Sequence, residues 1–571
     1  MLKLRRFLSD YKLQLIVGPL CKLFEAVLEL FAPLVMAQII DNGILKNDTG
    51  YVLRMGAVLV LLGVVGLSSA LVCQYMASYT SQGAGTKIRT ALFRHIGTLS
   101  HRELDEIGTP ALITRMTSDI NAVQANVAMT MRLLLRAPFL IIGALVMACF
   151  IDLKISVIFF VAALIIGLIL FLVMTKSLPF YKKIQSTLDR ISLISRENLS
   201  GSRVIRAFSK QKTHEENFEQ QTEKLAKTSK RVGRLSALLN PATYVVANSA
   251  IVLILYFGAG QVDSGALLSG DIVALASYMT QILLAMIVLA DLVVLLARGA
   301  ASGARINEVF EINPSVKELA SKDVIPKEKT PKIEFRNVSF SYGDGDSELE
   351  DISFSIDKNS TVGIIGTTGS GKSTLLSLIS RYYDAASGEV LVDGVDVKKY
   401  PFKQLRSNTA EVPQKSVLFS GTLRENMLWQ KPDATDGDIW SALRAAQADG
   451  FVDTLDKEVV QGGMNFSGGQ RQRLCIARAL VGNPSLIILD DSFSALDFAT
   501  EKKLRKNLCA RENTTIIIVT QRCSTIMNAD KILVLEDGRL EGQGTHGELI
   551  KNCPAYREIC LSQLGREEAG L

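Results

Sequence analysis

Six long apolar stretches constrain the fold of this chain more than any other feature. They run approximately over residues 13–44, 54–79, 127–151, 155–178, 241–260 and 272–297. A helix that crosses a membrane needs about 20 mostly apolar residues, because the hydrocarbon core is about 30 Å thick and backbone polar groups inside it must bond to one another. The chain has 571 residues, of which 48% are hydrophobic, so it is too long for one core and too apolar for a typical soluble protein. We therefore predict an all-α membrane domain with six spans over residues 1–302.

Lysine and arginine indicate how these spans are oriented. The links between spans two and three and between spans four and five are long and polar, with basic residues such as Arg94, Arg102, Lys183 and Arg190, whereas the other links are short and carry few. Because basic residues stay on the cytoplasmic side, both termini and both long links are predicted to face the cytoplasm. The same bias explains the formal charge of +6, so we expect contact with membrane lipid and no nucleic acid partner. The sequence predicts a multi-pass protein of the cytoplasmic (plasma) membrane.

The two long links keep a helical spacing of apolar residues well beyond the thickness of a membrane. The spans are therefore expected to continue into the cytoplasm as stalks. Each link is interrupted near its middle, at residues 106–110 and 197–201. We predict short transverse helices near residues 106–120 and 200–209, which would suit contact with a soluble domain. Ordinary loops are the alternative.

The chain changes character after the last span. Residues 303–330 are rich in charge and contain Pro314 and Pro326, which is typical of a linker. From residue 331 the sequence first alternates as a strand does, over residues 332–340, and then alternates between helical segments and buried strands to residue 571. We predict an α/β nucleotide-binding domain over residues 331–571.

The strongest single motif lies between a predicted strand, residues 361–365, and a predicted helix, residues 375–379. It matches the phosphate-loop pattern in its required strand-loop-helix context and comprises Gly366, Thr367, Thr368, Gly369, Ser370, Gly371, Lys372, Ser373 and Thr374. Its glycines let backbone N–H groups wrap phosphates at a helix N-terminus. Lys372 would reach the β- and γ-phosphates, and Ser373 would bind Mg²⁺. Asp490, which ends the apolar strand 486–489, is the expected second Mg²⁺ contact.

With these motifs the chain resembles the ATP-binding cassette (ABC) family, and the resemblance covers both domains. The segment 466–473 looks like the family signature, although Phe466 stands where leucine is usual. Gln414 matches the Q-loop, residues 418–426 match the segment that follows it in exporters, Tyr342 stands where an aromatic ring stacks on adenine, and residues 494–497, ending in Asp497, match the D-loop. Six spans fused ahead of one cassette are similar to an exporter half-transporter: a six-helix, exporter-type transmembrane domain fused to an α/β P-loop domain.

The resemblance implies that ATP and Mg²⁺ are bound, and that two cassettes close head to tail. Each ATP is then held between the phosphate loop of one chain and the signature of the other, here Ser467, Gly468, Gly469 and Gln470. A serine hydroxyl and glycine N–H groups at a helix N-terminus suit a γ-phosphate. Gln414 is a further candidate for contact with Mg²⁺ and with the reacting water. One chain therefore contributes to two different sites.

Two positions depart from the family pattern. Asp491 stands where the family has a catalytic glutamate, and Gln521 stands where it has a histidine near the γ-phosphate. Asp491 keeps the charge, but its carboxylate should fall roughly 1 Å short, and misplacement on that scale can cost about 10²-fold in rate. Gln521 can form hydrogen bonds but cannot become a cation. We expect this chain to hydrolyse its own ATP poorly while its signature remains intact.

These substitutions favour a functional asymmetry. The hypothesis is that the chain pairs with a second, non-identical exporter subunit that carries the glutamate and the histidine, as in bacterial heterodimeric multidrug exporters. The expected function is ATP-driven export of drugs or other lipophilic compounds. Two alternatives stay open: export of a specific lipid, peptide or siderophore, and an ATP-gated regulatory or channel-like membrane protein.

The sequence gives fewer indications of where a substrate would bind. Charges inside spans are usually functional or paired, and Asp291 in the sixth span is the candidate contact for a cationic drug. Glu25 and Glu29 in the first span, and Arg132 and Arg136 in the third, could bind ions or pair between helices. Aromatic residues such as Phe31, Tyr244, Tyr256 and Tyr278 could line an adaptable cavity or pack in the core.

The cysteines add no metal site at the level of sequence. Their spacing matches no metal-ligand pattern and only four histidines accompany them, so we interpret them as scattered reduced thiols; they are Cys21, Cys73, Cys149, Cys475, Cys509, Cys523, Cys553 and Cys560.

Overall fold

The structure is a computed structural model that describes the whole chain except residues 1, 319–323, 328, 344–346 and 565–571. Parts of the predicted linker and the last residues of the predicted nucleotide-binding domain therefore lie outside the described residues. The chain divides into two compact units, Met1–Gly97 with Thr109–Ile312, and Thr98–Gly108 with Asn313–Leu571. We call the first the membrane unit and the second the nucleotide unit, and describe each by itself.

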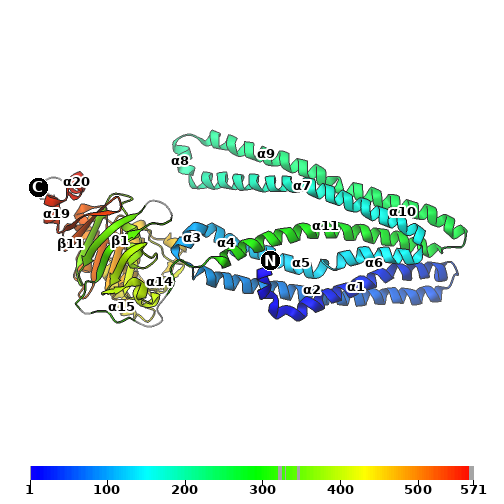
Figure 1. Cartoon of the computed structure of the whole chain (residues 1–571), viewed down its shortest axis with the longest axis horizontal. Helices are drawn as coiled ribbons and strands as arrows, with labels where there is room; N and C mark the ends of the chain where they lie inside the picture. Colours follow the sequence, from blue (N-terminus) through cyan, green and yellow to red (C-terminus); the bar gives the residue numbers. More distant parts are fainter. Residues whose placement is uncertain (1, 319–323, 328, 344–346, 565–571) are drawn as a thin grey trace. The chain divides into compact units, whose positions relative to one another are not determined.

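The membrane unit is helical throughout its described elements (Figure 1). Among the described residues, six helical runs are long and apolar enough to cross a membrane, which confirms the predicted number of apolar helices. The elements are η1 (Leu2–Tyr11), α1 (Lys12–Gln38), η2 (Ile39–Ile44), α2 (Thr49–Ile96), α4 (Thr109–Thr114), η3 (Arg115–Asp119), α5 (Ile120–Leu133), α6 (Arg136–Ile151), α7 (Leu153–Ser200), α8 (Ser202–Ala207), α9 (Gln211–Ala237), α10 (Leu239–Asp263) and α11 (Ser269–Glu311).

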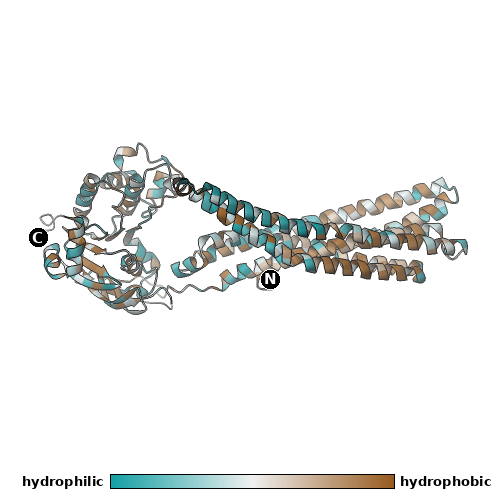
Figure 2. Cartoon of the chain, turned by 90° about the horizontal axis from the view of Figure 1, so that it is seen from above, coloured by the Kyte–Doolittle hydropathy of each residue, from teal (hydrophilic) through white to brown (hydrophobic). Residues whose placement is uncertain are grey.

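The longest helices exceed the thickness of a membrane. Helices α2 and α7 each have 48 residues, which corresponds to about 72 Å at about 1.5 Å per residue. Figure 2 shows that apolar residues gather toward one end of the long helices and hydrophilic residues toward the other. The apolar ends correspond to the predicted spans, and the hydrophilic ends correspond to the predicted stalks. Short helices α4 and α8 stand at the two predicted interruptions.

The predicted start of the linker, at residue 303, is too early. Helix α11 continues to Glu311, so residues 303–311 are helical. The reason is a buried stripe at helical spacing, formed by Gly299, Ser302, Gly303, Ile306 and Val309, which keeps one face of the helix packed although the opposite face is polar.

Several polar groups of the spans pair inside the membrane unit. Arg136 lies 2.7 Å from Glu29 on another helix, and Lys22 lies 2.6 Å from Glu25 within α1. The buried Tyr278 donates a hydrogen bond to the carbonyl oxygen of Leu30 across 2.7 Å, so this ring packs in the core and does not line a cavity. Pairing satisfies charges that would otherwise be costly at this depth.

The nucleotide unit is built on a six-stranded sheet in the order β12-β11-β3-β10-β9-β6, beside a four-stranded antiparallel sheet in the order β2-β1-β4-β5 and a two-stranded ribbon of β7 and β8. In the larger sheet β11, β3, β10, β9 and β6 are parallel and β12 is antiparallel. The strands are β1 (Ile333–Phe340), β2 (Leu349–Ile356), β3 (Thr361–Gly366), β4 (Ser387–Val392), β5 (Val395–Asp396), β6 (Thr409–Val412), β7 (Gly421–Thr422), β8 (Glu458–Val459), β9 (Leu486–Asp490), β10 (Thr515–Val519), β11 (Lys531–Glu536) and β12 (Arg539–Gly544).

The helical elements of this unit are α3 (His101–Ile107), α12 (Lys372–Ile379), η4 (Val397–Lys399), α13 (Phe402–Ser407), α14 (Leu423–Met427), α15 (Asp436–Ala445), η5 (Asp449–Phe451), η6 (Gln461–Gly463), α16 (Gly468–Leu480), α17 (Phe498–Cys509), α18 (Cys523–Ile526), α19 (His546–Asn552) and α20 (Pro554–Gln563). Among them α12, α13, α16, α18, α19 and α20 contact strands of the large sheet. Strands β9 and β10 are buried along almost their whole length, as expected for a parallel sheet covered on both faces. This unit and the six apolar helices together confirm the predicted fold class.

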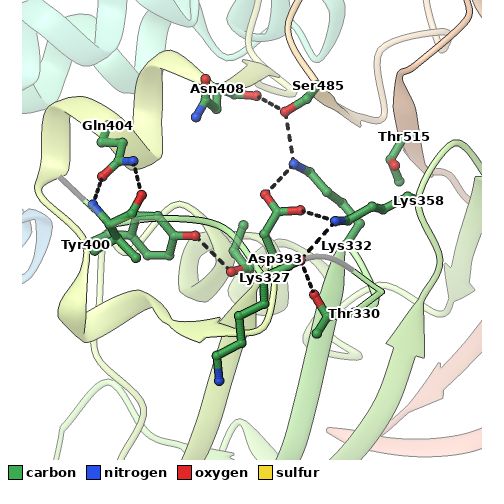
Figure 3. A network of polar contacts seen from close by, with 12 residues as sticks. Lys327, Thr330, Lys332, Lys358, Asp393, Tyr400, Gln404, Asn408, Ser485 and Thr515 are labelled. Atoms are coloured by element: carbon green, nitrogen blue, oxygen red, sulfur yellow. Dashed lines mark hydrogen bonds and ion pairs between the residues drawn. The ribbon is translucent and has the colours of Figure 1, made fainter.

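A buried ionic network fastens the two larger sheets together (Figure 3). Lys332 precedes β1, and its Nζ lies 2.8 Å from Asp393, which follows β4, and 2.9 Å from the hydroxyl of Ser485, which precedes β9. Lys358 contacts the same carboxylate at 3.6 Å. Ser485 lies before β9 begins, so the network sits at the edge of the parallel sheet opposite the carboxyl ends of its strands. It therefore supports the fold without entering the nucleotide pocket.

Helix α3 belongs to the nucleotide unit although it lies between two spans in the sequence. The hydroxyl of Tyr383 donates a hydrogen bond to Asp105 across 3.0 Å, and the ring of His101 lies 4.5 Å from the ring of Tyr382. Glu103 caps α3 and also accepts a hydrogen bond from the N–H of Ser315 at 3.0 Å. The packed segment, residues 98–108, begins before the predicted coupling segment 106–120.

Candidate functional site

Three adjacent parallel strands bring the predicted nucleotide residues to one edge of the large sheet. Strand β10 lies between β3 and β9, and Val519 pairs with Ile364 on one side and Asp490 on the other. The carboxyl ends of parallel strands meet at the same edge, which is where open α/β sheets bind ligands. The phosphate loop after β3, Gln521 after β10 and Asp491 after β9 consequently face one site.

The phosphate loop has the backbone that its glycines allow. Gly369 and Gly371 have φ angles of +87° and +88°, a left-handed conformation that side chains disfavour. The ammonium group of Lys372 lies over the loop, 3.0 Å from the carbonyl oxygen of Gly366 and 3.1 Å from the hydroxyl of Ser370. Burial lowers the pKa of Lys372 below its ordinary value. An anion placed in the loop would therefore gain a partly desolvated cation as its partner.

Ser373 and Asp490 are already in contact. The Ser373 hydroxyl donates a hydrogen bond to a carboxylate oxygen of Asp490 across 3.0 Å. Burial raises the pKa of Asp490, and the negative charge of Asp491 acts in the same direction. A partly buried carboxylate beside a hydroxyl, with the amide Gln414 lining the same pocket, is a set of oxygen ligands that suits Mg²⁺.

One pocket of about 210 Å³ collects half of the predicted site residues. Its lining includes ten of them: Thr368, Gly369, Gly371, Lys372, Ser373, Thr374, Gln414, Asp490, Asp491 and Gln521. Gly366, Thr367 and Ser370 belong to the loop but do not line the pocket. Tyr342 stands next to it, because its hydroxyl lies 3.0 Å from that of Thr374. Glu348 also lines the pocket, and no motif in the sequence pointed to it.

Both backbone polar groups of Asp491 form hydrogen bonds. Its φ angle is +45°, its N–H donates to the carbonyl oxygen of Val519 at 3.0 Å, and its own carbonyl oxygen accepts hydrogen bonds from Gln472 at 3.2 Å and Ser494 at 3.0 Å. The reach of its carboxylate is therefore set by the length of the side chain. Among the described residues that line the pocket there is no histidine.

The signature lies outside this pocket and has its own geometry. Ser467 caps helix α16, its hydroxyl accepts a hydrogen bond from the N–H of Gln470, and the Gln470 side chain accepts one from the N–H of Ser467 at 2.9 Å. Phe466 is buried in the core, so this departure from the family pattern serves packing. Asp497 of the D-loop caps α17 by accepting a hydrogen bond from the N–H of Thr500 at 3.0 Å.

The interpretation of the cysteines as scattered reduced thiols is wrong for one pair. Cys523 and Cys560 form a disulfide, and their sulfur atoms lie within 4.8 Å of a ring nitrogen of His546. The sequence separation of 37 residues hides this pair, because α18 and α20 come together only when the domain folds. Sequence spacing alone could not reveal it.

The comparisons with known proteins agree with this geometry. The family described as ABC transporter transmembrane region matches residues 15–286, and the family described as ABC transporter matches residues 349–494. An ABC transporter ATP-binding protein of Mycobacterium tuberculosis (strain CDC 1551 / Oshkosh), itself described as uncharacterized, is 38% identical over 98% of this chain and 97% of its own length. The chain belongs to the ABC transporter family.

Other ABC transporters match over almost the whole chain. The uncharacterized ABC transporter ATP-binding protein YfiB of Bacillus subtilis (strain 168) is 37% identical over 99% of both proteins. An ATP-dependent lipid A-core flippase of Yersinia pestis (strain Antiqua) is 29% identical over 98% of this chain and 97% of that protein. A bacterial Atm1-family ABC exporter with ATP bound shares the fold, with a TM-score of 0.78, 23% identity and coverage of 98% of both chains.

Membership of the ABC family establishes the general activity. The ABC transporter is a membrane protein whose ATP-binding domain binds ATP and couples it to transport across the membrane. The pocket at the ends of β3, β9 and β10 is where this chain contributes its phosphate loop.

Proposed function

We propose that this ABC transporter is one subunit of a heterodimeric exporter, and that the ATP site built on its own phosphate loop hydrolyses ATP poorly. The observation that carries the proposal is the composition of one pocket: an intact loop with Lys372, the Ser373–Asp490 pair, and Asp491 and Gln521 at the two positions that act on the γ-phosphate. A site that keeps its binding groups and alters only its hydrolytic groups is suited to retain ATP.

The chemistry of each altered group supports slow hydrolysis. A carboxylate in this position orients and activates the attacking water. Because the Asp491 backbone is fixed by Val519 and Gln472, the missing methylene is not compensated by movement of the chain. Gln521 can donate a hydrogen bond to a phosphate oxygen but adds no positive charge.

Mg²⁺ would be held by the hydroxyl of Ser373 and the carboxylate of Asp490, with Gln414 lining the same pocket. When bound, the cation would neutralise charge on the β- and γ-phosphates. Lys372 would bind the same phosphates with its ammonium group, and the loop N–H groups would orient them.

The signature is proposed to serve the partner subunit. Ser467 and the glycines that follow it begin a helix of 13 residues, and such an N-terminus with free N–H groups favours an anion. This chain would then help the partner's site turn over while its own site holds ATP. The partner is a second ABC exporter subunit that carries the catalytic glutamate and the histidine.

We propose drugs or other lipophilic compounds as substrates, moved out across the cytoplasmic (plasma) membrane with the ATP-binding domain in the cytoplasm. Asp291, which is exposed on α11, is the proposed contact for a cationic substrate. Similarity to a lipid A-core flippase favours a second candidate, in which the substrate is a specific lipid.

Co-purification of the tagged chain with the subunit encoded beside it tests the pairing. ATPase activity is then compared among the pair, the chain alone, and pairs with the partner's glutamate changed to glutamine or with Asp491→Ala. We expect activity in the pair, almost none in the chain alone, and loss only with the partner's variant. Vigorous ATPase activity of the chain alone, unaffected by Asp491→Ala, would contradict the proposal. Two assays in inverted vesicles then separate the two substrate classes. One measures ATP-dependent uptake of cationic dyes, and the other measures ATP-dependent movement of lipid.

A further inference from the structure

A buried cluster lies beside residues 521–523, which we call the Gln521 segment, and its side chains do not line the nucleotide pocket. Cys523 begins helix α18, two residues after Gln521, and Cys560 lies in α20, with 5.6 Å between their Cα atoms. Both cysteines and Tyr556 have no exposed surface, and His546 is half-buried beside them. A disulfide joins the two cysteines.

The neighbours of Cys523 form a path for a proton. The sulfur of Cys523 lies 3.4 Å from the hydroxyl of Tyr556, and that hydroxyl lies 2.8 Å from Nδ1 of His546. Burial raises the pKa of Tyr556 above its ordinary value, so the phenol stays neutral and can accept a proton from the thiol while it gives its own to the imidazole. Thiol chemistry requires such deprotonation, because the thiolate is the reactive form.

Helix α20 is also hydrogen-bonded to the Gln521 segment. The side chain of Gln563, at the end of α20, donates a hydrogen bond to the carbonyl oxygen of Gln521 across 2.6 Å and accepts one from the N–H of Cys523 at 2.9 Å. The disulfide and these two hydrogen bonds therefore fix α20 to the segment that carries a pocket residue. A cross-link restricts the separation of the segments it joins.

We propose that Cys523 and Cys560 are a site of reversible oxidative modification, in which formation of the disulfide fixes helix α20 to the Gln521 segment and reduction releases it. The oxidant is hydrogen peroxide. The Cys523 thiolate, after losing its proton through Tyr556 to His546, attacks one peroxide oxygen and becomes a sulfenic acid while the other oxygen leaves and is protonated to water. The Cys560 thiol then attacks the Cys523 sulfur, and the sulfenic oxygen leaves as a second water. Reduction by two equivalents of a low-molecular-weight thiol gives back both thiols and one external disulfide.

The cellular location adds one condition. Under the topology proposed above, the nucleotide unit lies in the cytoplasm, where disulfides are usually transient and redox-sensing. The inference rests on the proposed function in that respect alone. Both sulfurs are buried, so a small oxidant is favoured over a bulky one, and access occurs when α20 opens locally.

The test uses the full chain in lipid nanodiscs. Free thiols are alkylated after denaturation, before and after treatment with dithiothreitol, and cysteine peptides are identified by mass. We expect Cys523 and Cys560 to be protected until reduction, and hydrogen peroxide to restore protection. Tyr556→Phe should slow this reoxidation at least tenfold, whereas Cys553→Ser, which removes another buried thiol at the start of α20, should leave the rate unchanged.

Two further measurements report the consequence of the link. Reduction should lower the Tm of the wild-type chain by about 5–10 °C and shorten the retention of a fluorescent ATP analogue several-fold, and neither should change on reduction of Cys560→Ser. Should Cys560→Ser fail to fold, wild-type protein before and after reduction gives the same comparison. None of these readouts requires a partner or ATP hydrolysis, so they can fail independently of the proposed heterodimer.

Three outcomes would overturn the inference. Both cysteines could be alkylated in full before reduction and remain so after peroxide treatment. The disulfide could form but leave Tm and nucleotide retention unchanged. The reduced chain could instead bind one equivalent of zinc that blocks both thiols, which would make Cys523, Cys560 and His546 a metal site.

Discussion

Gln472, on the helix that the signature begins, donates a hydrogen bond to the backbone carbonyl oxygen of Asp491 across 3.2 Å. The same side chain accepts a hydrogen bond from the N–H of Ala495 at 3.2 Å, and it is buried. A segment that we propose serves one ATP site is thus bonded to the residue that we propose stands at the hydrolytic position of the other. Because the backbone of Asp491 is fixed, the length of its side chain determines how far its carboxylate reaches.

Asp491→Glu should raise hydrolysis at this chain's own site by about 10–100-fold, because one methylene returns the carboxylate to within reach of the water. Glutamate at a positive φ angle costs on the order of 1 kcal/mol in stability. The measurement is the ATPase rate of the pair with the partner's glutamate changed to glutamine. Asp491→Asn is the control and should change little. An unchanged rate for Asp491→Glu combined with Gln521→His would show that the impairment lies elsewhere.

Ser467→Ala and Lys372→Ala should separate the two sites to which the chain contributes. Ser467→Ala should reduce turnover of the pair at least tenfold, whereas Lys372→Ala should abolish ATP retention by this chain and leave much of the turnover. Since Ser467 also caps α16, its loss costs about 1 kcal/mol in stability. Thr435→Ala, which removes the same kind of cap from α15, is the matched control. The reverse pattern of effects would reject the assignment of sites.

Tyr383→Phe should weaken the attachment of α3 to the nucleotide unit by about 1 kcal/mol, because it removes the hydrogen bond to Asp105. We expect less substrate moved for each ATP hydrolysed, with ATP binding unchanged. A double-mutant cycle with Asp105→Ala isolates the pair. If the effects of the two substitutions on transport are additive, the hydrogen bond does not couple ATP hydrolysis to transport.

Glu411→Gln should stabilise the nucleotide-free chain at alkaline pH. Burial raises the pKa of Glu411 above its ordinary value of 4.5, with repulsion from Asp490 adding to it, although Ser380 donates a hydrogen bond to its carboxylate. A raised pKa in the folded state stabilises the fold below about pH 4.5, and that contribution is lost as the pH rises through the raised value. The variant should therefore gain about 2–4 °C in Tm at pH 8 and little at pH 4.5. Equal gains at both pH values would contradict this origin.

Lys332→Met should destabilise the nucleotide unit by about 3–5 kcal/mol, because it leaves the Asp393 carboxylate buried with a more distant cation. The side chains of this pair are only 6% and 12% exposed. Lys358→Met, at 40% exposure and 3.6 Å from the same carboxylate, is the control and should cost less than about 1 kcal/mol. Denaturant unfolding gives both values, and ATP affinity of the folded protein should be unchanged in either variant.

The sequence predicted most where local pattern and chemistry coincide. The phosphate loop was recognisable because Gly369 and Gly371 must adopt backbone angles that other residues disfavour. Asp490 was recognisable because it ends an apolar strand in a chain that also carries the phosphate loop, since an aspartate after an apolar strand is weak evidence by itself. Glu348 was missed since it belongs to no motif, and the true end of α11 was missed because a buried stripe of small residues resembles a linker in composition.

What the sequence by itself determined is therefore the two-part fold, the nucleotide motifs and the substitutions Asp491 and Gln521. Each depends on residues that are near in the chain or on a periodic pattern. Only the tertiary structure joined Cys523 to Cys560, placed Gln563 on the Gln521 segment and put α3 in the nucleotide unit. The physical reason is that these contacts link segments far apart in the chain, and their geometry is set by packing of the whole domain, which no local pattern encodes.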